Sequence, residues 1–185
     1  MNWLTNLEEA KEESQKSRKP ILLQFEMDNC GGCKKLYNET YPNPQVEKEM
    51  TEKFVLLKLD LIKDREIRKE FSGYWTPSFY FLDSKGKSYY NFNGYLPPDE
   101  YRIILRLGYA ETQIPKGKYA EVIEFMNKDI EQFDDKNPLL PKLLAQIGIA
   151  NYIKTKDKKV FMKAMKEIQR TYPNSLESKM YFWDS

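Results

Sequence analysis

The sequence contains no histidine and only two cysteines among its 185 residues. The absence of histidine excludes serine–histidine and cysteine–histidine nucleophilic catalysis, and it excludes zinc sites that need an imidazole ligand. Two thiolates cannot supply the four ligands of an all-cysteine zinc site within one chain. We therefore expect neither a metal nor another cofactor, and a cluster shared between two chains is the one metal arrangement left open.

The chain also lacks a strong net charge and a long hydrophobic run. Its formal net charge is +2, and the charged residues, 31% of the total, mix both signs. A nucleic-acid footprint needs a clustered basic face, so we expect no nucleic-acid partner. We expect no membrane span either. No apolar leader precedes the first predicted helix, which as given predicts a cytoplasmic protein; the alternative is a periplasmic protein whose signal peptide was removed.

The two cysteines, Cys30 and Cys33, lie where a predicted strand turns into a predicted helix. Residues 19–25 form a short apolar run opened by a proline, which is typical of a buried strand, whereas residues 33–39 favour a helix. The N-terminus of a helix stabilises a thiolate through free N–H groups and the positive end of the helix dipole. We therefore expect Cys30 to attack a disulfide and Cys33, one turn further on, to resolve the mixed disulfide.

Together with a second motif, this cysteine pair resembles the thioredoxin fold. The second motif is Trp75-Thr76-Pro77, directly before the predicted strand 78–82. In that family the Thr–Pro bond is cis and lies beside the attacking sulfur, where the backbone pairs with the substrate chain. The resemblance covers roughly residues 1–110 and is nearest to the thioredoxin-like domains of bacterial disulfide-interchange proteins. It implies that Trp75, Thr76 and Pro77 bind substrate. It also implies an α/β fold in which helices flank a mixed sheet.

The chain departs from the thioredoxin pattern at two positions. Gly32 stands where thioredoxins usually have proline, so the resemblance does not set the direction of electron transfer. Gln24 stands where the family has a buried acid, six residues before the first cysteine. Glu26 points to the same strand face as Gln24, so it is a candidate proton acceptor during resolution; the alternative is a solvated carboxylate. Lys58 occupies the position of a family lysine near that acid, which predicts that Lys58 pairs with Glu26.

Apolar spacing predicts the remaining elements of this domain. We expect helices at 4–18, 45–53, 64–71 and 99–110, and strands at 54–60, 78–82 and 88–93. Leu4, Leu7 and Ala10 are spaced to share the apolar face of the first helix. Tyr74 and Trp75 either form an apolar rim around the thiols or pack within the fold.

Beyond residue 110 the pattern is helical only. Apolar residues recur at helical spacing within 117–126, 143–152 and 160–168. Residues 107–110 and 147–150 share an apolar-Gly-apolar-Ala pattern. In each copy we expect a helix and then a proline turn to follow this pattern, and in the first copy we expect the helix to end at Phe133. This faint repeat resembles tetratricopeptide hairpins, and a simple helical extension that caps the first domain is the alternative. We predict a thioredoxin-like domain at 1–110 and a helical extension at 111–185.

Two functions fit these features. The first is a thiol–disulfide oxidoreductase that exchanges its Cys30–Cys33 pair with protein substrates and a recycling redox partner. The second is an interaction protein in which the disulfide is a structural remnant and the helical extension recruits a partner. A disulfide across so short a loop stabilises a fold weakly, which favours the enzyme. The apolar end of the chain, 180–183, is expected to pack against the body or a second subunit, which leaves a homodimer open.

Overall fold

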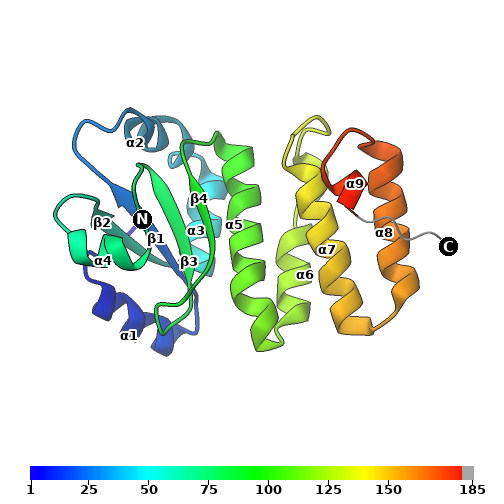
Figure 1. Ribbon diagram of the computed structural model, residues 1–185, viewed down its shortest axis with the longest axis horizontal. Helices are drawn as coiled ribbons and strands as arrows, with labels where there is room; N and C mark the ends of the chain where they lie inside the picture. Colours follow the sequence, from blue (N-terminus) through cyan, green and yellow to red (C-terminus); the bar gives the residue numbers. More distant parts are fainter. Residues whose placement is uncertain (181–185) are drawn as a thin grey trace. The chain divides into compact units, whose positions relative to one another are not determined.

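The computed structural model describes residues 1–180, and the chain divides into two compact units between Thr112 and Gln113. The first unit contains a four-stranded sheet with strand order β2-β1-β3-β4 (Figure 1). The strands are β1 Ile21–Glu26, β2 Val55–Asp60, β3 Ser78–Leu82 and β4 Ser88–Asn93. β1 pairs in parallel with β2 and antiparallel with β3, and β3 pairs antiparallel with β4. This mixed sheet flanked by helices confirms the predicted fold class.

Helices cover both faces of the sheet. They are α1 Leu7–Ser17, α2 Gly31–Lys35, the π-helical turn η1 Leu36–Thr40, α3 Pro44–Lys53, α4 Arg65–Glu70 and α5 Pro98–Gln113. The odd-numbered side chains of β1 form a core with Leu7 and Ala10 of α1 and with Ile67 of α4. Because strand side chains alternate, Gln24 and Glu26 point to the opposite face, on which η1 and α5 pack.

The N-terminal segment differs from the prediction. Asn6 caps α1 by accepting hydrogen bonds from the next helical N–H groups, so the helix begins at Leu7. Leu4 is therefore not part of the helix, and placing it on the apolar helix face was wrong. It forms a parallel bridge with Leu57: its N–H donates to Leu56 O at 2.9 Å, and the Lys58 N–H donates to its carbonyl at 2.9 Å. Edge pairing with β2 thus competes successfully with helix formation here.

The other predicted elements of this unit agree closely with the structure. Strands β3 and β4 have the predicted bounds. Asn43 caps α3 through two N–H groups, and Pro44 opens the helix. Helix α5 is longer than predicted, since it continues past Ala110 to Gln113.

A buried ion cluster joins α3 to α5. Arg102 Nε and Arg106 Nη2 both donate to Glu49 Oε1, at 2.9 and 2.7 Å, and all three side chains are nearly inaccessible to solvent. Charge-assisted hydrogen bonds of this kind are strong in a low-dielectric interior, where an uncompensated charge is costly. The cluster therefore fixes the two helices on the sheet face that carries Gln24 and Glu26.

The second unit is helical in the part that the structure describes. It contains η2 Ile114–Lys116, α6 Tyr119–Asn127, η3 Ile130–Gln132, α7 Leu140–Thr155, α8 Lys158–Thr171 and α9 Glu177–Met180. α7 packs against both α6 and α8, and Ala145, Phe161, Met165 and Ile168 form a small core. The helix predicted to reach Phe133 ends at Asn127, so that prediction was wrong in its length. Residues 181–183 of the apolar chain end lie outside the described residues.

Both glycines of the sequence repeat are points of close packing. A Cβ on Gly108 would lie 2.2 Å from the ring of Phe81 in β3, so the α5 backbone rests on the sheet. A Cβ on Gly148 would lie 3.0 Å from Cβ of Ala164 in α8. The shared pattern therefore serves a helix–sheet contact in one copy and a helix–helix contact in the other. The likeness to tetratricopeptide hairpins stays a prediction.

Replacing Glu49 tests the buried cluster. We expect Glu49→Gln to lower the free energy of unfolding by about 3 kcal/mol, because two buried arginines lose a carboxylate charge. Glu47→Gln is the matched control on the same helix, since Glu47 is half-exposed and pairs with the N-terminal amine. It should change stability by at most about 0.5 kcal/mol. Urea unfolding measures both, and equal losses in the two variants would contradict the assigned role of the cluster.

Candidate active site

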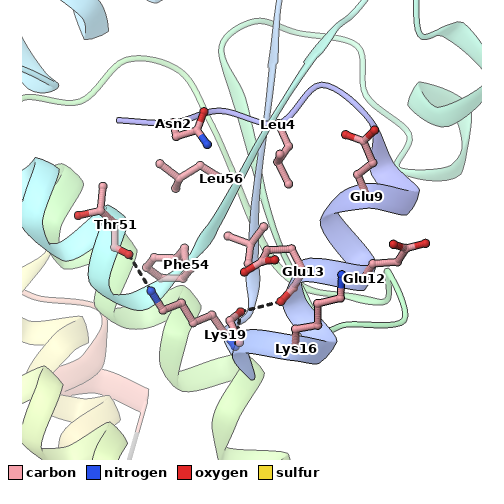
Figure 2. Close-up of a pocket in the computed structure, with 12 residues that line it drawn as sticks. Asn2, Leu4, Glu9, Glu12, Glu13, Lys16, Lys19, Thr51, Phe54 and Leu56 are labelled. Atoms are coloured by element: carbon pink, nitrogen blue, oxygen red, sulfur yellow. Dashed lines mark hydrogen bonds between the residues drawn. The ribbon is translucent and has the colours of Figure 1, made fainter.

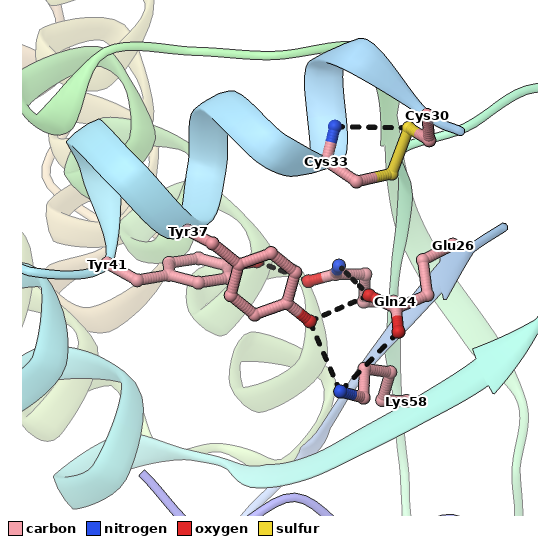
Figure 3. Close-up of a disulfide and its surroundings, with 7 residues drawn as sticks. All are labelled: Gln24, Glu26, Cys30, Cys33, Tyr37, Tyr41 and Lys58. Atoms are coloured by element: carbon pink, nitrogen blue, oxygen red, sulfur yellow. Dashed lines mark hydrogen bonds and ion pairs between the residues drawn. A yellow bond between two sulfur atoms is a disulfide. The ribbon is translucent and has the colours of Figure 1, made fainter. Parts of the chain in front are cut away.

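The two cysteines form a disulfide where the loop after β1 enters α2 (Figure 3). Cys30 is the N-cap residue of α2, and its Sγ accepts a hydrogen bond from the Cys33 N–H at 3.0 Å. Each cysteine is only 5% exposed. The pair thus lies at a strand-to-helix junction, as the sequence predicts, and an N–H group of the first helical turn points at the sulfur expected to attack.

The segment around Pro77 packs directly against this turn. The Thr76–Pro77 peptide bond is cis. A Cβ on Gly32 would lie 2.8 Å from Pro77 Cδ, so only a residue without a side chain fits there without a shift. Thr76 and Pro77 are buried, whereas Trp75 is 58% exposed. The structure therefore places Pro77 against the cysteine helix and leaves the Trp75 ring open to solvent. Packing within the fold, one of the two roles considered for Trp75, does not account for this exposure.

A polar cluster lies on the sheet side of the disulfide (Figure 3). Lys58 Nζ is 3.4 Å from Glu26 Oε1, and both side chains are about three-quarters buried. The Tyr37 hydroxyl donates to Glu26 Oε2 at 2.7 Å, and Lys58 Nζ donates to the Tyr37 hydroxyl at 3.2 Å. The pairing of Glu26 with Lys58 that the sequence suggests is therefore present, while the role of Glu26 in proton transfer stays a prediction.

Gln24 connects this cluster to the interior. Its side chain is fully buried, its Oε1 accepts a hydrogen bond from the Tyr41 hydroxyl, and its Nε2 donates to Glu26 Oε2 at 3.3 Å. Burial raises the pKa of Tyr41, and the neighbouring Tyr101 adds to this. Burial and the hydrogen bond to Glu26 raise the pKa of Tyr37. Both hydroxyls therefore stay protonated across the physiological pH range and act as donors.

Sequence reasoning missed the two tyrosines. Tyr37 and Tyr41 follow the cysteine pair four residues apart, a spacing that places side chains on one helix face. That spacing was the available signal. The widened turn that carries Tyr37, closed by a hydrogen bond from Tyr41 N to Leu36 O at 2.8 Å, has no comparable signature in the sequence.

A cavity of about 480 Å³ lies elsewhere, between α1, α3 and the edge of β2 (Figure 2). Leu4, Phe54 and Leu56 contribute apolar lining, and Lys19 Nζ donates to Thr51 O at 2.9 Å beside it. None of the predicted site residues lines this cavity. The cavity is therefore separate from the disulfide and from the polar cluster beneath it.

Within residues 1–180 the structure shows neither a cluster of metal ligands nor a membrane-spanning helix. No group of three or more His, Cys, Asp or Glu side chains in this range is placed to hold a metal ion. Within the same range, every helix is too short or too polar to cross a bilayer. The only chemistry that the described residues bring together around the predicted site is that of the disulfide and the polar cluster beneath it.

Comparisons with known proteins agree with this geometry. A family model for a thioredoxin-like domain matches residues 7–108. The thiol:disulfide interchange protein DsbD of Campylobacter jejuni strain RM1221 is 27% identical over 103 residues, which cover 54% of this chain and 18% of that protein. The chain thus spans less than a fifth of that relative's length.

Solved structures share the fold. A putative disulphide-isomerase from Bacteroides thetaiotaomicron has a TM-score of 0.53 and 24% identity, covering 58% of this chain and 90% of its own. A thioredoxin from Thermus thermophilus has a TM-score of 0.52 and 20% identity, covering 58% of this chain and 85% of its own. At these identities the similarity shows the fold of the part of the chain that the two structures cover, and nothing more.

The two glycines between the cysteines provide a matched pair of variants. We expect Gly32→Ala to lower the free energy of unfolding by about 1–3 kcal/mol, because its methyl group would overlap the rigid ring of Pro77. Gly31→Ala should be neutral or stabilising by up to about 1 kcal/mol, because no atom lies near its added Cβ and alanine favours the helix. Chemical unfolding of both oxidised proteins measures the difference. If Gly31→Ala were the more destabilising variant, the contact with Pro77 would be refuted.

Proposed function

The chain belongs to the thioredoxin-like domain family, and we propose that it is a thiol–disulfide oxidoreductase acting on protein substrates. One observation carries the proposal: the Cys30–Cys33 disulfide lies at the start of a helix, with the cis Pro77 segment packed against the same turn. A disulfide that closes so short a loop contributes little to stability, so a structural role does not account for it.

The exchange proceeds in two steps. In the reduced protein the Cys30 thiolate attacks a substrate disulfide; a Cys30–substrate bond forms, and the released substrate sulfur takes a proton from water. Cys33 then gives up its proton and attacks the Cys30 sulfur, which forms the Cys30–Cys33 disulfide and frees the second substrate thiol. Two electrons pass to the substrate, and the reverse sequence oxidises a dithiol. In both directions, residues 75–77 bind the substrate backbone and an apolar side chain beside the thiols.

Glu26 and Lys58 support the second step. Glu26 accepts the proton that Cys33 loses, in place of the acid that Gln24 replaces. Lys58 stabilises the carboxylate before the proton arrives, which their separation of 3.4 Å and partial burial support. Positioned carboxylates of this kind contribute to rate by taking a proton as the bond forms.

Each turnover leaves the pair in the opposite redox state, so a second thiol–disulfide protein resets it. The direction of exchange sets the compartment: a reducing pair suits the cytoplasm or an electron relay outside it, and an oxidising pair suits the periplasm. Self-association through the apolar chain end stays a separate proposal.

Single cysteine variants test the proposal. With insulin as a model disulfide substrate and dithiothreitol as reductant, Cys30→Ser and Cys33→Ser should each lose turnover by at least about 100-fold while keeping the far-UV circular dichroism of the parent. Cys33→Ser should also accumulate a Cys30–insulin mixed disulfide, because the resolving sulfur is missing. The interaction-protein alternative would replace this proposal if the parent showed no turnover and both variants kept full binding to a partner.

A further inference from the structure

Three donors converge on the carboxylate beneath the disulfide, and one of them comes from an unusual turn. We propose that Tyr37 is a positioning residue, which the π-helical turn η1 aims at Glu26 so that the carboxylate is held ready for the Cys33 proton. This inference rests on the proposed function and adds to it a residue that the Cys-x-x-Cys and Thr-Pro motifs do not include.

In the contacts around Glu26, the neighbouring side chains are the donors and the Glu26 carboxylate is the acceptor. Tyr37 donates to Oε2 at 2.7 Å, Gln24 donates to the same oxygen at 3.3 Å, and Lys58 lies 3.4 Å from Oε1. Lys58 also donates to the Tyr37 oxygen at 3.2 Å. An ammonium group has only donors and a hydroxyl has one, so the Tyr37 proton is left to point at Glu26. The contacts therefore hold the Glu26 carboxylate in a fixed orientation.

The turn η1 explains how Tyr37 reaches this position. Helix α2 ends at Lys35, and the Tyr41 N–H bonds to the Leu36 carbonyl, five residues back. Single π-helical turns of this type occur often at functional sites. The rings of Tyr37 and Tyr41 lie edge to face with centroids 5.3 Å apart, and their hydroxyls reach Glu26 and Gln24 respectively. The two tyrosine hydroxyls thus hydrogen-bond to two side chains, Glu26 and Gln24, on one face of β1.

Tyr37 positions the acceptor and does not exchange a proton itself. Burial and the hydrogen bond to Glu26 raise the pKa of Tyr37, so the hydroxyl keeps its proton throughout the cycle. In the resolving step the Cys33 proton passes to the Glu26 carboxylate as the new S–S bond forms. The resulting carboxylic acid later returns the proton to solvent.

Tyr37→Phe removes the hydroxyl and keeps the ring. In single-turnover experiments with a preformed Cys30 mixed disulfide, we expect resolution by Cys33 to slow about tenfold at pH 7, the effect of losing one hydrogen bond to a charged group. The difference should vanish above about pH 9, where thiols ionise without a base. Tyr89→Phe is the matched control, because its hydroxyl donates to Asp83 at 3.3 Å in the turn between β3 and β4. It should resolve at the parent rate at every pH.

A double variant separates positioning from a general structural effect. If Tyr37 acts through Glu26, adding Tyr37→Phe to Glu26→Gln should slow resolution no further. An equal slowing in both backgrounds, a loss that persists at high pH, or a parent-like rate in Tyr37→Phe would each overturn the inference. A parent protein without insulin turnover would instead contradict the proposed function, so the two failures are distinguishable.

Discussion

The packing of the first turn of α2 against Pro77 is the contact on which the site depends. It joins two segments far apart in the sequence, one carrying the cysteines and the other opening β3. The antiparallel register of β1 with β3 sets where Pro77 lies, since Phe25 pairs with Ser78. Gly32 lets the helix approach, because a Cβ would lie 2.8 Å from the proline ring. Sheet register and one missing side chain together place the disulfide beside the segment proposed to bind substrate.

Local signals explain what the sequence predicted well. The cysteine pair lies between an apolar run and a helix-forming run, and the residues of each run predict the secondary structure of that same segment. β3 and β4 have their predicted bounds because Gly86 marks the turn between two aromatic-rich segments. Strand periodicity placed Glu26 on the same face as Gln24, and the resemblance to thioredoxins then suggested its pairing with Lys58.

Non-local interactions explain what the sequence did not show. Leu4 fits a helical pattern, yet it pairs with Leu57 at the edge of β2. Its conformation therefore depends on a strand that lies far along the chain, which local spacing does not reveal. Tyr37 lies in the π-helical turn η1, and the hydrogen bond from Tyr41 N to Leu36 O that defines this turn leaves no residue pattern of its own. Gly108 and Gly148 looked like one repeat, although one packs on a strand and the other on a helix.

The measurement that tests the central claim most directly is a redox titration of the Cys30–Cys33 pair against glutathione or dithiothreitol, followed by thiol alkylation. A working pair should show one two-electron transition with a potential between about −270 and −120 mV, the range of thiol–disulfide oxidoreductases. Its place in that range would separate a reductase from a disulfide donor. A potential below about −300 mV, as structural disulfides have, would contradict the claim that this pair exchanges electrons with other proteins.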